Sequence, residues 1–123
     1  MSTGYHEANL SDAATNIHRA IASLQEELEA TDWYNQRADV SQDEELTAIL
    51  EHNRNEEIEH ACMLLEYLRR NMPEFDEELR TYLFKSAPIT QLEELAEAEE
   101  EEGTDAGEAN DAQDESLGIG GNV

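Results

Sequence analysis

The apolar positions of the first part of the chain recur at helical spacing. Ser11 is a suitable N-cap residue, and no Gly or Pro interrupts the chain from there until Pro73. The steps between apolar residues are mostly three and four positions, and the series consists of Ile17, Ala20, Ile21, Leu24, Leu28 and Thr31. This spacing predicts a long amphipathic helix over about residues 12–38.

The segment "ADVSQDEEL" interrupts this pattern and predicts the start of a second helix. Ser41 followed by Glu44 is typical of a capping box, in which each side chain bonds a backbone N–H of the first turn. The second helix is therefore predicted to begin at Gln42 and to end near Asn71. Two arginines occupy its last turn, where the helix dipole favours positive charge.

Two shorter helices are predicted after Pro73. Pro73 suits a first helical position, and Pro88 can open a further helix. Residues 96–115 are acidic, of low complexity and almost free of large apolar side chains, so we expect disorder there. The predicted organisation is a flexible lead-in over residues 1–10, a helical domain over 11–95, an acidic linker over 96–115 and an apolar end over 116–123.

The fold class is thus all-α: an antiparallel two-helix hairpin with short C-terminal helices and a disordered acidic tail. Two long helices alone cannot bury their apolar stripes on both sides. We therefore expect self-association, in which dimerisation completes a four-helix bundle.

Polar residues interrupt the apolar stripe of the second helix. On a helical wheel, Leu46, Leu50, Leu64 and Leu68 lie within about 40° of a common direction. Glu57 and His60 fall inside the same arc, together with Asn53. In an antiparallel hairpin, Glu27 of the first helix comes level with the upper fifties and is expected to face Glu57 and His60.

This trio has two interpretations. A Glu–His hydrogen bond between the helices can set their register without any metal. Two carboxylates facing one imidazole, however, leave surplus negative charge, which a divalent cation neutralises. Mixed carboxylate and imidazole ligands suit iron or manganese, with zinc as a further option.

Glu-x-x-His is a weak motif in an acidic chain, but the number of ligands that each helix supplies is informative. Di-iron four-helix bundles take one Glu from each of two helices and Glu-x-x-His from each of the other two. One copy of this chain offers half of that set, and two copies related by a twofold axis would complete it.

The net charge of the chain excludes some classes of binding partner. Acidic residues number 31 and basic residues 7, giving a net charge of −24. Nucleic acid and anionic membrane surfaces are therefore not expected as partners. No apolar run is long enough for a membrane span and no signal peptide is evident, so a cytosolic location is expected.

The remaining metal-binding residue types are interpreted as structural. Cys62 lacks a partner for a disulfide or a zinc ribbon and is predicted to be a small buried packing residue. His6, His18 and His52 are predicted to be surface or interface residues.

A second group lies on the face of the first helix opposite its apolar arc. Glu26, Glu29 and Trp33 share this face, and Tyr34 follows Trp33. An aromatic residue among carboxylates predicts contact with a neighbouring chain, whereas the alternative is a charged surface with one stray aromatic. Tyr34 is expected near the trio.

Several strings are similar to the encapsulated ferritins, which are two-helix ferritin-like proteins held as cargo inside encapsulin shells. They are "NIHRAIASLQEELEATDWYNQRAD", "LTAILEHNRNEEIEHACMLLEYLRRNMPEFDEELRTYLF" and "APITQLEEL", within residues 6–95. The end "SLGIG" resembles the peptide by which such cargo docks on the shell's inner wall. The residues concerned are Leu117, Gly118, Ile119 and Gly120.

The resemblance implies a ferroxidase, which oxidises Fe(II) to Fe(III) with O₂ or peroxide and feeds mineral storage in a cytoplasmic encapsulin nanocompartment. It implies a di-iron centre between two subunits with Glu27, Glu57 and His60 as ligands. It also implies a ring of ten chains, a pentamer of dimers. Glu26 and Glu29 match a secondary metal site, for which Ca²⁺ is a candidate ion.

A rival function follows from the same features. The chain can be a non-catalytic helical adaptor or a metal-binding structural protein that docks on a partner through its C-terminal peptide. In that case Glu57 and His60 serve as register-setting polar contacts.

Overall fold

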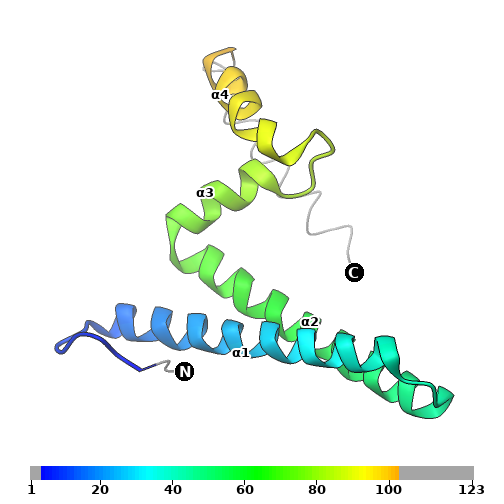
Figure 1. The fold of residues 1–123 in the computed structure, drawn as a ribbon. Helices are drawn as coiled ribbons and strands as arrows, with labels where there is room; N and C mark the ends of the chain where they lie inside the picture. The colour runs from blue at the N-terminus through cyan, green and yellow to red at the C-terminus, as the bar shows by residue number, and fades with distance from the viewer. Residues whose placement is uncertain (1–3, 103–123) are drawn as a thin grey trace. The chain divides into compact units, whose positions relative to one another are not determined.

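The computed structural model describes residues 4–102, which are helical and contain no strand. Helix α1 (Asp12–Val40) and helix α2 (Glu44–Asn71) pack against each other as an antiparallel hairpin (Figure 1). Helix α3 (Pro73–Tyr82), a 3₁₀ helix η1 (Ile89–Gln91) and helix α4 (Leu92–Glu102) follow. The chain divides into two compact units between Glu77 and Glu78. The predicted all-α class and the helical hairpin are confirmed.

The N-terminus of α1 is fixed by a side-chain cap. The Ser11 hydroxyl accepts a hydrogen bond from the Ala14 N–H at 3.1 Å, as the sequence predicted. Residues 4–10 form no helix, but Tyr5 lies against His18 with ring centroids 4.5 Å apart. His18 thus makes a packing contact, in line with its interpretation as a surface residue.

The turn between the two long helices corrects the predicted capping box. Ser41 is the C-cap of α1 and donates its N–H to the Arg37 carbonyl at 3.1 Å. Asp43 caps α2 instead, because its carboxylate accepts from the Leu46 N–H at 2.9 Å. Ser41 ends one helix, so it cannot begin the next; α2 therefore starts at Glu44, two residues later than predicted.

Substitution of the two candidate caps should separate these roles. We expect Asp43→Ala to destabilise the protein by about 1 kcal/mol, because a backbone N–H of α2 loses its partner. Ser41→Ala should cost less, since its C-cap contact is made by the backbone. Urea unfolding of both variants measures the difference in the free energy of unfolding. A larger loss of stability in Ser41→Ala than in Asp43→Ala would support the predicted capping box instead.

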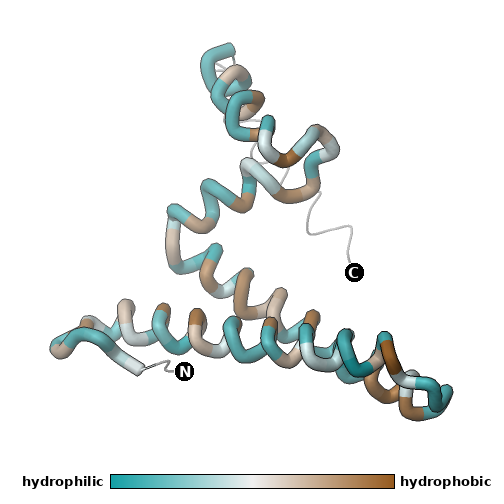
Figure 2. The backbone as a smooth tube through the Cα atoms, viewed as in Figure 1, coloured by the Kyte–Doolittle hydropathy of each residue, from teal (hydrophilic) through white to brown (hydrophobic). Residues whose placement is uncertain are grey.

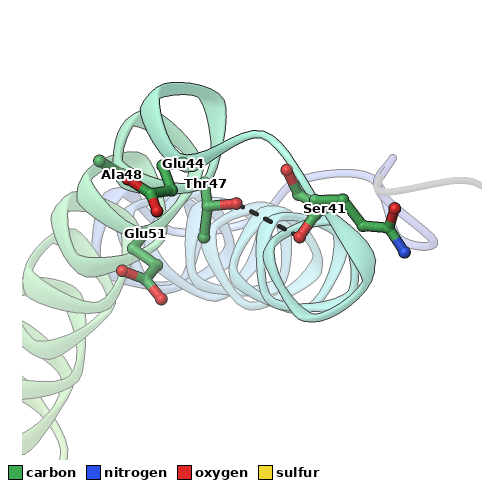
Figure 3. A pocket seen from close by; sticks show the side chains of 6 residues that line it. Ser41, Glu44, Thr47, Ala48 and Glu51 are labelled. Carbon is green, nitrogen blue, oxygen red and sulfur yellow. Dashed lines mark hydrogen bonds between the residues drawn. The ribbon is translucent and has the colours of Figure 1, made fainter.

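A shallow, open hollow lies at this turn. Its volume is about 230 Å³, and Thr47 donates a 3.5 Å hydrogen bond across it to the Ser41 carbonyl (Figure 3). Its lining residues are Ser41, Gln42, Glu44, Thr47, Ala48 and Glu51. None of them belongs to the Glu27–Glu57–His60 trio, so the hollow does not bear on the candidate chemistry.

Small side chains line the contact between the long helices. Ala20 and Ala38 of α1 and Ala61 of α2 are buried, and Leu68 is the only large side chain among the described residues that is fully buried. Alanine at a helix contact lets the two backbones approach closely. This contact alone provides a very small apolar core.

Much of the apolar surface of the hairpin remains exposed. Hydrophobic positions recur along both helices (Figure 2), and the exposed large ones on α1 and α2 are Ile21, Leu28, Trp33, Val40, Leu46, Ile49, Ile58, Met63 and Tyr67. So many exposed apolar side chains on one hairpin mark interaction surfaces. The structure therefore supports the expectation of self-association.

An ion-pair network fixes the end of α2. Glu66 accepts from Arg69 at 2.8 Å and from Arg70 at 2.7 Å, and Arg69 also pairs with Asp76 of α3. The hydrogen bonds from Arg69, then those from Arg70, lower the pKa of Glu66 to about 2. The two basic residues predicted at this helix end are thus paired there with two carboxylates, those of Glu66 and Asp76.

The second unit contains η1 and α4, which pack on each other and bury Leu92. Helix α4 continues to Glu102, so the prediction of disorder from residue 96 is wrong for residues 96–102. Alternation of Glu with Ala favours helix, which the composition argument overlooked. The rest of the predicted acidic linker and the peptide at 116–123 lie outside the described residues.

The prediction that Cys62 is buried is wrong, because its side chain is exposed. Cys62 lies five residues after Glu57, which places it about 140° away on the helical wheel and off the buried stripe. The position of Cys62 on the helix, and not the general tendency of cysteine to be buried, therefore determines its exposure. None of the described helices is long and apolar enough to cross a membrane.

Candidate metal centre

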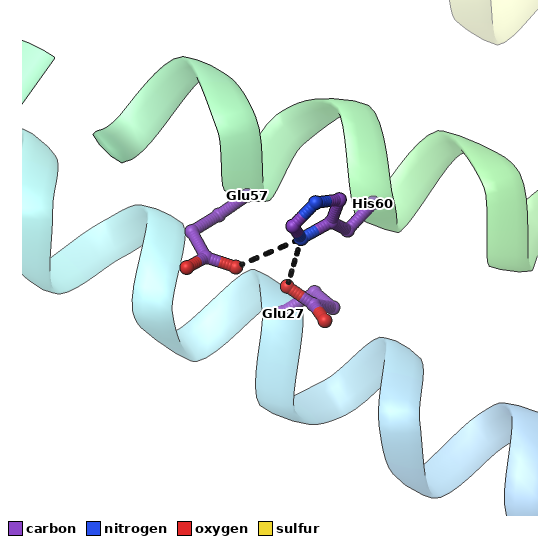
Figure 4. Close-up of side chains that lie close together, drawn as sticks. All are labelled: Glu27, Glu57 and His60. Atoms are coloured by element: carbon purple, nitrogen blue, oxygen red, sulfur yellow. Dashed lines mark ion pairs between the residues drawn. The ribbon is translucent and has the colours of Figure 1, made fainter. Parts of the chain in front are cut away.

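The structure brings Glu27, Glu57 and His60 together on the hairpin. His60 Nδ1 lies 3.4 Å from Glu27 Oε1 and 3.4 Å from Glu57 Oε1 (Figure 4). One ligand atom from each residue can be chosen so that all three lie within 4.8 Å of one another. Among the described residues this is the one group of at least three His, Cys, Asp or Glu side chains with that geometry.

Helix geometry explains how the three side chains meet. Glu57 and His60 are three residues apart on α2 and thus share one side of it. Glu27 reaches them from α1, where the Thr31 hydroxyl donates to the Glu27 carbonyl at 2.8 Å. Ala61, which follows His60, is buried, and a side chain this small lets packed helices lie close together.

The trio is only partly shielded from solvent. The side chains of Glu27 and Glu57 are each 25% exposed, whereas that of His60 is 42% exposed. Polar groups that were predicted to be buried in a helix core are thus half-open in one chain. A second chain covering this side would complete their burial.

The pKa values of Glu27 and His60 are both raised above their ordinary values. Hydrogen bonding to Glu57 is the largest cause that raises the pKa of Glu27, followed by partial burial and the Glu57 charge. For His60, partial burial is the largest influence and lowers the pKa, but Glu27 and Glu57 together outweigh it and raise the pKa. The neighbouring carboxylates contribute to both shifts, and a bound cation would take the place of the protons that these groups hold.

The donor set fits a divalent transition metal. Two carboxylates and one imidazole are ligands that iron, manganese and zinc accept. Three protein donors on one open side leave further coordination positions for a second chain or for small molecules. A hydrogen-bonded Glu–His pair needs only one carboxylate, so the second carboxylate favours the metal interpretation.

The predicted second group does not form a cluster within this chain. Glu26 and Glu29 are exposed and are not joined by a third metal-binding side chain among residues 4–102. Trp33 is 51% exposed, which agrees with an uncovered contact surface. Their roles in metal binding or chain contact stay predictions.

The structure also shows contacts that the sequence analysis missed. The Arg37 guanidinium lies 5.8 Å from the Trp33 ring centroid and 5.6 Å from that of Tyr34. Tyr34 is two turns from Glu27, about 10 Å along the helix axis, and its expected closeness to the trio stays a prediction. The spacing of Arg37 from the two aromatics, four and three residues, was the available signal.

A second missed contact joins the helices away from the trio. Arg54 of α2 donates to the Asn35 side-chain oxygen of α1 at 3.0 Å. Between α1 and α2, this bond and the trio are the side-chain polar links of the hairpin. Together they hold the register in which Glu27 meets His60.

A helical hairpin with a Glu on one helix and Glu-x-x-His on the other is typical of one half of a ferritin-like four-helix bundle. Comparison with known proteins agrees, because the sequence model described as EncFtn-like matches residues 3–86. The chain is a member of the EncFtn-like family.

Three relatives show how far the similarity extends. An encapsulated ferritin-like protein of Rhodospirillum rubrum is 58% identical over 112 residues, which cover 90% of this chain and 80% of the relative. A ferritin-like protein of Thermotoga maritima is 55% identical over 96 residues, covering 76% of this chain and 84% of that protein. A crystal structure of a Nitrosomonas europaea protein has a TM-score of 0.67 and 59% identity, covering 70% of this chain and 97% of that one.

Proposed function

We propose that this protein is a ferroxidase, which binds Fe(II) at the Glu27–Glu57–His60 trio and oxidises it to Fe(III). The observation that carries the proposal is the placement of two carboxylates from two helices at 3.4 Å from one imidazole nitrogen. Membership of a family with ferritin-like relatives supports iron as the metal. Two irons held side by side would supply the two electrons that O₂ or peroxide accepts.

The complete site requires a second copy of the chain. One copy provides three donors and leaves His60 partly exposed. A twofold partner would bring another Glu27, Glu57 and His60 to the same place, giving the donor set of a di-iron four-helix bundle. Each chain then contributes two carboxylates and one imidazole, so that the four carboxylates balance the charge of two Fe(II) ions and each iron has one imidazole.

Metal binding and association are linked in this arrangement. A ligand that binds the dimer but not the monomer shifts the population toward the dimer. The assembled protein would place its oxidised iron in the space around it, which fits storage inside an encapsulin shell in the cytoplasm. The printed name of the R. rubrum relative, an encapsulated ferritin-like protein, supports this location.

Anaerobic titration with Fe(II), followed by oxygen, tests the function. We expect about one iron per chain and a dimer or larger species by native mass spectrometry, and then an oxygen-dependent rise in Fe(III) absorbance. A protein that carries no stoichiometric iron and causes no such rise would instead be the helical adaptor considered above.

Removal of residues 116–123 tests the proposed docking on a shell. We expect the truncated chain to lose co-purification with a co-expressed encapsulin shell, because Leu117 and Ile119 supply the apolar contacts of the peptide. Iron oxidation should stay unchanged, since the trio is in residues 27–60. Normal encapsulation of the truncated chain, or loss of oxidation with encapsulation retained, would contradict this division.

A further inference from the structure

Arg54 occupies a position of α2 where packing alone favours a small or apolar side chain. It lies seven residues before Ala61 and fourteen before Leu68, and these three residues share one stripe of the helix within about 40°. Ala61 and Leu68 are buried in the hairpin, whereas Arg54 is half-buried. A charged group at such a place needs polar partners, and the partners of Arg54 indicate what it does there.

The Arg54 guanidinium binds two side-chain amides. One N–H group donates to the Asn35 side-chain oxygen of α1 at 3.0 Å, and another donates to the Asn55 side-chain oxygen of α2 at 3.2 Å. Both acceptors are neutral, although the chain carries 31 acidic residues. The link to α1 therefore adds no carboxylate that would compete with the trio for a cation.

The Arg54–Asn35 link lies near the trio but at a different height along the contact between the helices. Arg54 is three residues, about 4.5 Å, before Glu57 on α2, and Asn35 is eight residues, about 12 Å, after Glu27 on α1. On the helical wheels, Arg54 is about 60° from Glu57 and Asn35 about 80° from Glu27. The link and the trio thus join α1 and α2 at two separate points, so that α1 can neither slide along α2 nor turn about a single contact.

The trio depends on this alignment because its ligand atoms come from both helices. Glu27 Oε1 lies 3.4 Å from His60 Nδ1 across the contact, and Glu57 Oε1 lies 3.4 Å from the same nitrogen within α2. A functional metal site holds its donors to within about 0.5 Å. A shift of α1 by one residue, about 1.5 Å, would exceed that tolerance for Glu27 and leave the Glu57–His60 pair unchanged.

The alignment affects which metal is bound as well as how tightly. In a site whose donors move freely, Zn(II) generally binds more tightly than Fe(II), and proteins select iron through the geometry that they impose. Zn(II) also prefers a tetrahedral set of donors, which side chains that are free to move can adopt. A fixed Glu27 therefore disfavours Zn(II) relative to Fe(II).

We infer that Arg54 and Asn35 are a positioning pair, which fixes Glu27 against Glu57 and His60 and thereby favours Fe(II) over Zn(II) at the trio. Neither side chain is a metal ligand in this arrangement, because a guanidinium has no acceptor and the Asn35 oxygen accepts from Arg54. The inference rests on the proposed function, since it takes the trio as the iron site.

Five variants test the pair against wild type. Arg54→Ala and Asn35→Ala each remove the link, and the double variant removes both partners. Asn35→Asp keeps an oxygen acceptor at the same place and serves as the rescue. Arg19→Ala is the matched control, because it loses the same charge while the Arg19 hydrogen bond, to Asn16 at 3.0 Å, lies within α1.

Three measurements are made on each variant. Anaerobic titrations with Fe(II) and with Zn(II) give the two affinities, at protein concentrations where native mass spectrometry shows the same oligomer throughout. Co(II) is the spectroscopic probe, because its visible absorption reports the coordination geometry of the bound ion. Urea unfolding in the presence of a chelator reports the link without metal.

We expect Arg54→Ala and Asn35→Ala to raise the ratio of Zn(II) affinity to Fe(II) affinity by at least about tenfold, in the range that outer partners of metal ligands reach. Both variants should change the Co(II) spectrum in the same way. The double variant should match Arg54→Ala in this ratio and in its urea midpoint, because the same link is lost. Asn35→Asp and Arg19→Ala should keep the wild-type ratio and spectrum.

Equal changes of the Fe(II) and Zn(II) affinities in Arg54→Ala would overturn the inference. So would an equal rise of the ratio in Arg19→Ala, a raised ratio in Asn35→Asp, or a double variant in which the two single effects add. Wild type that binds no Fe(II) would refute the proposed function and the inference with it. Wild type that binds Fe(II), with both alanine variants keeping its affinity ratio, would refute the inference alone.

Discussion

Glu57→Ala and His60→Ala are each expected to weaken Fe(II) binding by more than about 100-fold, since even outer partners of metal ligands change affinity by 10–100-fold. Each substitution removes one of the three candidate donors of a chain, and in the proposed twofold dimer it would remove that donor twice from every complete site. The oxygen-dependent Fe(III) absorbance should fall to the rate of iron in buffer. Anaerobic titration and stopped-flow absorbance measure the two effects.

Glu59→Ala provides the matched control for these variants. Glu59 is an exposed carboxylate on the same helix, two residues from Glu57 and pointing away from the trio. The Glu59→Ala variant loses one carboxylate, as Glu57→Ala does, but keeps the trio intact. Its Fe(II) affinity should therefore stay close to that of wild type. Full iron oxidation and metal-dependent assembly in Glu57→Ala and His60→Ala would refute the assignment of the trio.

Leu68→Ala is expected to cause the largest loss of stability of any single truncation in the hairpin, about 2–5 kcal/mol. The Leu68 side chain has 0% exposure, and the other buried positions between α1 and α2 are alanines. Truncation therefore opens a cavity in the only place where the hairpin has a large buried group. Urea unfolding in the presence of a chelator measures the loss without a contribution from metal.

Met63→Ala on the same helix serves as the comparison. Met63 is 57% exposed, so its truncation removes little buried contact in the metal-free chain and should cost less than about 1 kcal/mol. Equal losses in the two variants would show that Leu68 is not the centre of the hairpin's core. A larger loss for Met63→Ala when Fe(II) is present would locate Met63 in the contact between copies.

The sequence was sufficient for the features that depend on helix periodicity. Ser11 as N-cap, the hairpin and the meeting of Glu27 with Glu57 and His60 all follow from residue spacing. The meeting of these three side chains could be predicted because polar residues interrupt an otherwise apolar stripe. A single helical wheel therefore located the candidate site.

Other features could not be predicted, because residue spacing does not decide between alternative local structures. Ser41 and Asp43 are both good caps two residues apart, and only the backbone of the turn decides that Ser41 ends α1 and Asp43 begins α2. The left-handed backbone of Phe84 is equally invisible in the sequence, since the residue type disfavours it. The partial exposure of the trio in one chain is also not apparent from the sequence, because the helical wheel places these residues on the apolar stripe.

The alanines between the helices make the distance between α1 and α2 a tunable dimension of the site. Ala61 adjoins His60 in the chain and is buried in the contact with α1, so each added methyl group there would push the imidazole away from Glu27. The ionic radius that the proposed metal donors would accept is thus set partly by residues that carry no donor atom. In the proposed ferroxidase, the size of one neighbouring side chain would therefore change the metal preference while Glu-x-x-His stays unchanged.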